Sequence, residues 1–193
     1  MTRARTPAAA RARSLTAATL SRWPFPPLGE DTDKESRGRV LIVAGSHEIP
    51  GAALLAGVAA LRAGAGKLAI AAPERVAIGL ALAIPEARVI GVAEARSGGF
   101  DARGCRAIEP VASRASAVVL GPGMLDERRS QRFVAALLPM AREATVVLDA
   151  YAMAVVDGPP FEQAVILTPH AGEMAHLTGL SKEAVNADFV LLA

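Results

Sequence analysis

The sequence has few of the residues on which several protein classes depend. It contains one cysteine, one tryptophan and one tyrosine among 193 residues, and only 4% of its side chains are aromatic. A single thiol, Cys105, cannot form an internal disulfide, which excludes a disulfide-stapled domain and favours a reducing compartment, the cytoplasm. No histidine neighbours this thiol in the sequence, so we interpret it as an inert, half-buried side chain and not as a nucleophile.

Other signatures are missing as well. No stretch reaches the ~18 uninterrupted apolar residues of a membrane-spanning helix, because Arg62 interrupts the longest candidate. No cysteine pair, His-x-x-x-His pair or acidic cluster has the spacing of metal ligands, and we therefore predict no metal site. The serine elbow Gly-x-Ser-x-Gly, the dinucleotide motif Gly-x-Gly-x-x-Gly and the Walker phosphate loop are also absent, which disfavours those three chemistries.

The basic character of the chain is confined to its start. Residues 1–29 carry five arginines and no acid, whereas residues 30–193 carry 16 basic and 19 acidic side chains, a net charge of −3. This mildly acidic body has no basic stripe, so nucleic-acid binding has no support. The start resembles an organelle transit peptide in composition, but we favour a bacterial leader or a misassigned start codon.

Beyond a proline-containing connector at residues 23–38, short apolar runs alternate with segments of helical length. The predicted strands are 40–44, 68–71, 88–91, 117–120, 145–148 and 164–167. The predicted helices are 52–63, 74–84, 127–143, 172–177 and one that Ser181 opens as N-cap, and residues 101–114 form a mixed segment.

Strands that are apolar on both faces, separated by helices, indicate a parallel sheet covered on both sides. We therefore predict an α/β fold of three layers. In such sheets, ligands bind beyond the carboxyl ends of the strands, so the residues that follow each apolar run are the candidates for function.

Two of these strand ends are rich in glycine. Residues 44–53 (Ala-Gly-Ser-His-Glu-Ile-Pro-Gly-Ala-Ala) lead into a helix, whose amino end offers N–H groups to an anion. Residues 121–124 (Gly-Pro-Gly-Met) form a second close-approach turn, with Asp126 as a possible helix N-cap. Each turn fits either ligand binding or simple chain reversal, and neither pattern alone decides between them.

Polar side chains follow two other strands. Asp149 is placed to bind a hydroxyl group or a magnesium ion, or to cap a helix. Residues 167–174 (Leu-Thr-Pro-His-Ala-Gly-Glu-Met) end a strand and place His170 at the ligand edge, where we favour contact with a ligand over a purely structural role. His176 is expected on the surface of the helix that follows, and His47 in the first glycine loop is a further possible contact.

Taken together, four segments resemble the NAD(P)H-hydrate dehydratase family of the ribokinase-like superfamily. They are 38–46 (Gly-Arg-Val-Leu-Ile-Val-Ala-Gly-Ser) with Gly51-Ala52, 60–66 (Ala-Leu-Arg-Ala-Gly-Ala-Gly), 121–123 (Gly-Pro-Gly) and 167–174. The order of the four is far more specific than any one of them. The resemblance covers residues 38–193, and we predict a dehydratase domain there that follows a basic leader and connector, disordered in part, at residues 1–37.

The resemblance implies a ribokinase-like sheet and an activity. Members of this family repair NADH or NADPH whose nicotinamide ring is hydrated: ADP or ATP, with Mg²⁺, phosphorylates the ring hydroxyl, and loss of phosphate restores the double bond. It also implies binding of the hydrated dinucleotide by the strand-end residues of this sequence, which are Gly45, Ser46, Gly51, Ala52, Gly121, Gly123, Asp149, His170 and Glu173.

The sequence departs from the family pattern in three places. Tyr151 replaces the second acid of the usual Asp-Ala-Asp-Ala-Leu, and Ala171 replaces the second proline of Thr-Pro-His-Pro-Gly-Glu. The third departure concerns the catalytic aspartate, since no Gly-Thr-Gly-Asp occurs in these 193 residues. From this we expect a sheet that is incomplete at its carboxyl-terminal side, with an exposed edge that favours self-association.

Two alternatives remain open at this point. One is a non-catalytic relic that holds a nucleotide in its glycine loops. The other is a small-molecule kinase of the same superfamily that acts on a sugar or a hydroxymethylpyrimidine. Both would share the fold.

The missing motif leads to the first testable prediction. Phosphoryl transfer depends on positioning and on electrostatic stabilisation, so the isolated chain should show little or no turnover of hydrated NADH with ADP or ATP and magnesium. An absorbance assay for regenerated NADH measures this, and turnover at a rate typical of the family would contradict it.

Overall fold

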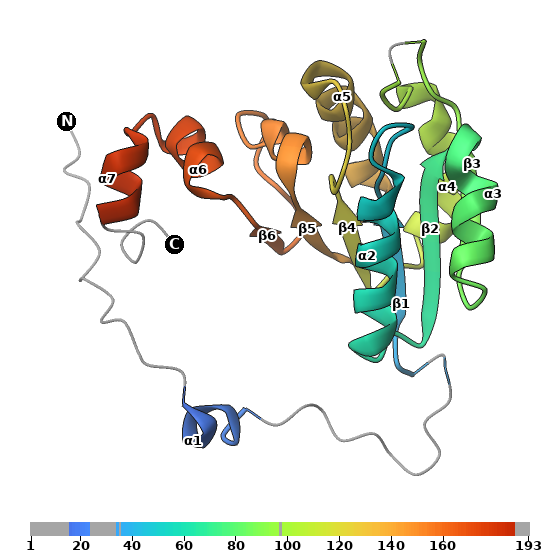
Figure 1. Cartoon of the computed structure of the whole chain (residues 1–193), viewed down its shortest axis with the longest axis horizontal. Coiled ribbons are helices and arrows are strands. Elements are labelled where there is room, and N and C mark those ends of the chain that lie inside the picture. The colour runs from blue at the N-terminus through green and yellow to red at the C-terminus, as the bar shows by residue number, and fades with distance from the viewer. Residues whose placement is uncertain (1–15, 24–33, 35, 97, 188–193) are drawn as a thin grey trace. The chain divides into compact units, whose positions relative to one another are not determined.

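The computed structural model describes residues 16–23, 34, 36–96 and 98–187 (Figure 1). By their contacts the residues divide into two compact units, one of residues 31–168 and one that combines residues 1–30 with 169–193. The predicted boundary between residues 37 and 38 stays a prediction. Most of the predicted connector lies outside the described residues.

The larger unit contains a parallel sheet of six strands in the order β3-β2-β1-β4-β5-β6. The strands are β1 (Arg39–Val43), β2 (Lys67–Pro73), β3 (Arg88–Val92), β4 (Ala117–Leu120), β5 (Thr145–Leu148) and β6 (Val165–Leu167). Each neighbouring pair is parallel, as predicted. The order reverses between β1 and β4, and this reversal creates the crevice in which open α/β sheets bind ligands.

Helices cover both faces of the sheet. Helices α2 (Pro50–Arg62) and α3 (Glu74–Ala83) lie in front of it in Figure 1, and α4 (Cys105–Ala112) lies behind it. Helix α5 (Glu127–Leu137) packs against α4 and against the 3₁₀ helix η3 (Ala150–Val155). Two shorter 3₁₀ turns, η1 (Ala102–Gly104) and η2 (Leu138–Met140), border α4 and α5. The three predicted layers are confirmed.

Two apolar layers form the core of the larger unit. Ile42, Leu68 and Ile70 pack with Leu80 and Ile84 between the sheet and the pair α2 and α3. Elsewhere, the rings of two fully buried phenylalanines, Phe100 and Phe133, lie 4.9 Å apart between centroids. Because β1 is buried on both faces, its four residues after Arg39 form a continuous apolar run.

The described part of the smaller unit contains three short helices, α1 (Ala17–Leu20), α6 (Ala171–Thr178) and α7 (Lys182–Ala187). Helix α1 falls within the predicted leader, and Thr16 caps it by accepting a hydrogen bond from the N–H of Thr19. Ser181 accepts a hydrogen bond from the N–H of Ala184 at 3.1 Å, which confirms its predicted capping of α7. No helix in the described ranges has both the length and the apolar composition to cross a bilayer.

Two features differ clearly from the prediction, whereas the other predicted strands and helices begin and end within two residues of the observed ones. The helix predicted over 127–143 ends at Leu137 and tightens into η2, because Pro139 lacks the N–H that an α-helix requires. Helix η3 was not predicted, since it begins at Ala150, whose φ of 48° is rare for a residue with a side chain.

Cys105 begins α4 and is 1% exposed, so the thiol is more deeply buried than the half-buried state predicted. Its Sγ–H donates to the carbonyl oxygen of Phe133 at 3.4 Å. Burial raises the pKa of the thiol to about 11, because the thiolate loses its hydration in apolar surroundings.

A thiol with this pKa should be unreactive in the folded chain. At pH 8 only about one thiol in a thousand is ionised, and the thiolate is the reactive form. We expect Ellman's reagent to modify Cys105 at least ~100-fold more slowly in buffer than in concentrated guanidinium chloride. Cys105→Ala supplies the blank, and equal rates in the two solvents would contradict the assignment.

Candidate functional site

The loop that follows β1 is joined to the loop that follows β4. The N–H of Gly45 donates to the carbonyl oxygen of Pro122 at 2.7 Å, and Gly45 has a φ of 83° that suits glycine. The N–H of Gly121 donates in turn to Val43 at 3.1 Å. The two glycine loops predicted from sequence therefore meet at the reversal of the strand order.

Gly121 and Gly123 have no room for side chains. Both have positive φ, 118° and 71°. A Cβ at Gly123 would lie 2.7 Å from the Cβ of Ala52, and one at Gly121 would overlap the carbonyl oxygen of Asp149. The second glycine loop is thus wedged between the first loop and the end of β5, and its glycines have a packing role before any role in binding.

Ser46 and Gly51 have different surroundings in the first loop. Ser46 is fully buried, and its Oγ accepts a hydrogen bond from the N–H of Ile49 at 3.0 Å, which makes it a turn-forming residue. Gly51 is exposed, and a Cβ there would meet no heavy atom within 4 Å.

Pro50 is the first residue of α2, and the N-cap Ile49 makes no side-chain cap bond. Gly51 and Ala52 therefore lie in the first turn of α2, a region that attracts anions, although the N–H of Ala52 already donates to the carbonyl oxygen of Ile49 at 3.4 Å.

The carboxylate of Asp149 joins the ends of two strands. Its Oδ1 accepts a hydrogen bond from Thr168 Oγ1 at 2.7 Å, and its N–H donates to the carbonyl oxygen of Leu120 at 2.9 Å. Asp149 stands at the N-cap position of η3 without a side-chain cap bond. The role of Asp149 toward a ligand hydroxyl or a magnesium ion stays a prediction, and the hydrogen bond observed is the one to Thr168 within the chain.

His170 and Glu173 belong to the smaller unit and form a capping box on α6. His170 Nδ1 accepts hydrogen bonds from the N–H groups of Gly172 and Glu173 at 3.0 and 3.2 Å. Glu173 Oε2 accepts one from the N–H of His170 at 2.9 Å. Because Nδ1 is an acceptor, the neutral ring carries its proton on Nε2, which lies 3.5 Å from Oε1 of Glu173 in an exposed side chain.

The remaining candidates have local roles. Asp126 caps α5 as predicted, with Oδ1 accepting from the N–H of Arg129 at 3.2 Å. The imidazole of His47 lies over the α-carbon of Gly98, where any side chain would clash with it, and forms a 3.5 Å ion pair with Glu48 when protonated. His176 is exposed on α6.

Sequence reasoning missed Thr168 as a site residue. From the sequence, Thr168 appears only as part of the strand-ending motif at residues 167–174, although its hydroxyl is the direct partner of Asp149. The spacing of 19 residues between the two offers no local signal, and only the pairing of β5 with β6 brings them together.

Comparison with known proteins identifies relatives of this chain. Residues 40–190 match the family model described as NAD(P)H-hydrate dehydratase. An ADP-dependent (S)-NAD(P)H-hydrate dehydratase of Xanthomonas campestris is 49% identical over 177 residues, which is 92% of this chain and 60% of the relative.

Solved structures agree. The crystal structure of the ADP/ATP-dependent NAD(P)H-hydrate dehydratase of Bacillus subtilis, co-crystallised with ATP/Mg²⁺, superposes with a TM-score of 0.71 at 32% identity, covering 89% of this chain and 58% of that one. A ribokinase-like superfamily protein of Enterococcus faecalis superposes with a TM-score of 0.68 at 22% identity over 80% of this chain and 53% of that one, which supports the fold. The chain thus spans about three fifths of the length of the first two relatives.

The pair formed by Asp149 and Thr168 can be tested by substitution. Thr168→Val keeps the shape of the side chain but removes the donor to the carboxylate, and we expect it to lower the free energy of unfolding by about 1 kcal/mol. Urea titration of the chain measures this difference.

Thr145→Val is the matched control, because Thr145 is exposed on β5 and has no side-chain hydrogen bond to any described residue. This change should alter stability by less than about 0.5 kcal/mol. Equal effects of the two substitutions would show that the hydrogen bond does not stabilise the chain.

Proposed function

Because the chain belongs to the NAD(P)H-hydrate dehydratase family, we propose that it acts in the repair of hydrated NAD(P)H and binds the hydrated dinucleotide at the carboxyl edge of its sheet. The proposal includes ADP as the second substrate, in line with the name of the Xanthomonas relative. The observation that carries it is the contact of the two glycine loops through Gly45 and Pro122, at the reversal of the strand order.

The residues at this edge suit a dinucleotide physically. A pyrophosphate carries two negative charges, and the first turn of α2 presents backbone N–H groups at the positive end of the helix dipole. Gly51 leaves the approach to this turn open, whereas the closely packed Gly121 and Gly123 hold the backbone of the adjacent loop in one conformation. The role of these residues is to bind and orient the substrate.

Magnesium is not assigned to any residue. In the described ranges no group of three or more histidine, cysteine, aspartate or glutamate side chains is arranged to hold a metal ion. One oxygen of Asp149 is already engaged by Thr168. Magnesium needs only one or two carboxylates besides the phosphates of a nucleotide, and the Bacillus relative was co-crystallised with ATP/Mg²⁺, so magnesium stays part of the proposal without an assigned ligand in this chain.

The relatives favour this function over the two alternatives. The Xanthomonas and Bacillus relatives are named as dehydratases of hydrated NAD(P)H, which supports the dehydratase over a sugar or pyrimidine kinase. A binding relic would share the dinucleotide site, and only turnover separates it from an enzyme.

We also propose that the chain works in the cytoplasm, which its single buried thiol supports. We further propose that it forms a homo-oligomer, because β6 is an edge strand of the sheet and its Ile166 is 53% exposed.

A pair of glycine substitutions tests the binding site. Gly51→Leu adds a bulky side chain at the first turn of α2, at a position where a Cβ would meet no heavy atom within 4 Å. It should weaken binding of hydrated NADH by about tenfold or more, because the side chain blocks close approach of the pyrophosphate. Isothermal titration calorimetry of the native chain and the variant measures the change.

Gly79→Leu is the matched control, since Gly79 is also an exposed helical glycine with open space around it, on α3. It should bind hydrated NADH within about twofold of the native chain. Circular dichroism first checks that the native chain is folded. The proposal fails if this folded chain shows no saturable binding of hydrated NADH, or if the two variants bind hydrated NADH equally.

A further inference from the structure

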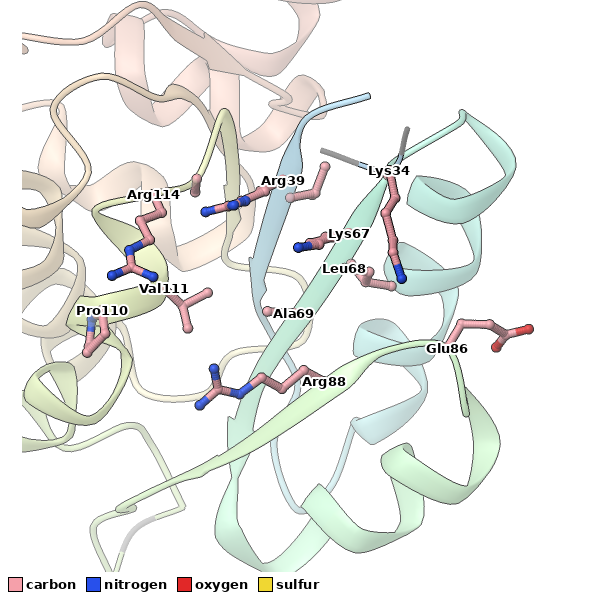
Figure 2. Close-up of a pocket in the computed structure, with 13 residues that line it drawn as sticks. Lys34, Arg39, Lys67, Leu68, Ala69, Glu86, Arg88, Pro110, Val111 and Arg114 are labelled. Atoms are coloured by element: carbon pink, nitrogen blue, oxygen red, sulfur yellow. The ribbon is translucent and has the colours of Figure 1, made fainter. Parts of the chain in front are cut away.

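Two cavities lie at the amino edge of the sheet, the edge opposite the glycine loops. The first, of about 430 Å³, is lined by the amino ends of β1, β2 and β3 and by α4 (Figure 2). Two of its cations, Arg39 and Lys67, already take part in interactions within the chain, so its charge does not call for a ligand. The second, of about 390 Å³, lies where the chain leads into β5 and β6.

The second cavity separates α5 and η2 from the segment of chain that enters β6. One wall belongs to α5 and η2 and includes Ala135, Leu138 and Pro139. The other wall consists of Val155, at the end of η3, and residues 158–163. All of these residues belong to the larger unit. The volume of the cavity is within the range of small-molecule sites.

Two glutamines of the lining tie the walls to each other. Gln131 of α5 donates from Nε2 to the carbonyl oxygen of Ala154 in η3, at 2.7 Å. Gln163 donates from Nε2 to the carbonyl oxygen of Leu138 in η2, at 2.6 Å. Because these hydrogen bonds lie within the chain, the shape of the cavity is set before a ligand arrives. A preformed cavity loses less entropy when it binds a ligand.

Most of the lining of the second cavity is apolar. Val155 is buried, and Leu138 and Phe161 are partly buried. The rings of Pro159 and Pro160 fix φ, so this part of the wall has little conformational freedom to lose. An aromatic side chain such as Phe161 prefers to meet another ring offset or edge to face. The walls therefore suit a ligand with a flat, apolar ring.

The lining also carries a cation that has no partner among the described residues. Arg142 pairs with Glu162 of the opposite wall, with Nε 3.4 Å from Oε2. Arg132, on α5, forms no ion pair within the described ranges. The residues three and four positions away from it on either side are arginines and alanines, so no acid of its own helix lies beside it. The second cavity thus offers one positive charge that its own lining leaves unpaired.

These charges favour a ligand with a single negative charge. The guanidinium fork of an arginine matches the two oxygens of a carboxylate with two parallel hydrogen bonds. A ligand with several phosphate groups is disfavoured, because Glu162 lies in the same lining and repels further negative charge.

We propose that the second cavity, which we name the α5 pocket, binds a small aromatic carboxylate. The ring lies between the apolar walls, and the carboxylate accepts hydrogen bonds from Arg132. The proposal does not depend on the dehydratase function, because the α5 pocket shares no residue with the proposed dinucleotide site.

The direct test uses 2-naphthoate as the probe and 2-naphthamide as its neutral match, since the two share one ring system. Titration calorimetry of the full chain should show saturable binding of 2-naphthoate, about fivefold or more tighter than binding of 2-naphthamide. Arg132→Gln should weaken 2-naphthoate binding by about fivefold or more and leave 2-naphthamide binding within about twofold. Arg132 is exposed, so the variant should fold as the native chain does, and circular dichroism checks this.

Two further variants make the test specific. Arg106→Gln is the matched control, because it removes an exposed arginine of α4 that does not line the α5 pocket. It should leave the affinity for 2-naphthoate within about twofold. Ala135→Trp fills the α5 pocket from an exposed position of α5 and should weaken binding of both probes by about tenfold or more.

Four outcomes would each overturn the proposal. They are absence of saturable 2-naphthoate binding by the folded native chain, equal affinity for the two probes, a loss with Arg106→Gln as large as that with Arg132→Gln, and unchanged binding in Ala135→Trp. Gly51→Leu, which alters the proposed dinucleotide site, should leave 2-naphthoate binding unchanged. Failure of the dehydratase proposal is therefore distinguishable from failure of this one.

Discussion

The hydrogen bond from the N–H of Gly45 to the carbonyl oxygen of Pro122 joins the two halves of the sheet at its ligand edge. Strands β1 and β4 are neighbours although 73 residues separate the end of one from the start of the other. Their loops meet only because Gly121 and Gly123 lack side chains that would collide with Asp149 and Ala52. The amino end of α2 is positioned by the same contact, since Gly123 packs against Ile49 and Ala52.

Hydrogen bonds at the carboxyl edge show how structural and functional demands share the same residues. Asp149 accepts a hydrogen bond from the hydroxyl of Thr168, and Ser46 accepts one from the N–H of Ile49. Each of these side chains therefore has its orientation set before a ligand arrives. A binding site whose polar groups are already oriented loses less entropy when it binds, which is the physical advantage of such rigid strand ends.

Much of the fold was predictable because its signals are local. All six strands, the N-caps Asp126 and Ser181 and the inert thiol Cys105 follow from runs of apolar residues, capping chemistry and neighbouring side chains. The order of the strands, the contact of Asp149 with Thr168 and the placement of His47 over Gly98 depend on long-range contacts. Pairing is decided by long-range burial, which no sequence window contains.

The sequence by itself therefore determined the class of fold, the family and the identity of the strand-end residues. Only the tertiary structure decided which of those residues touch, because side chains far apart along the chain become neighbours only when the sheet is assembled.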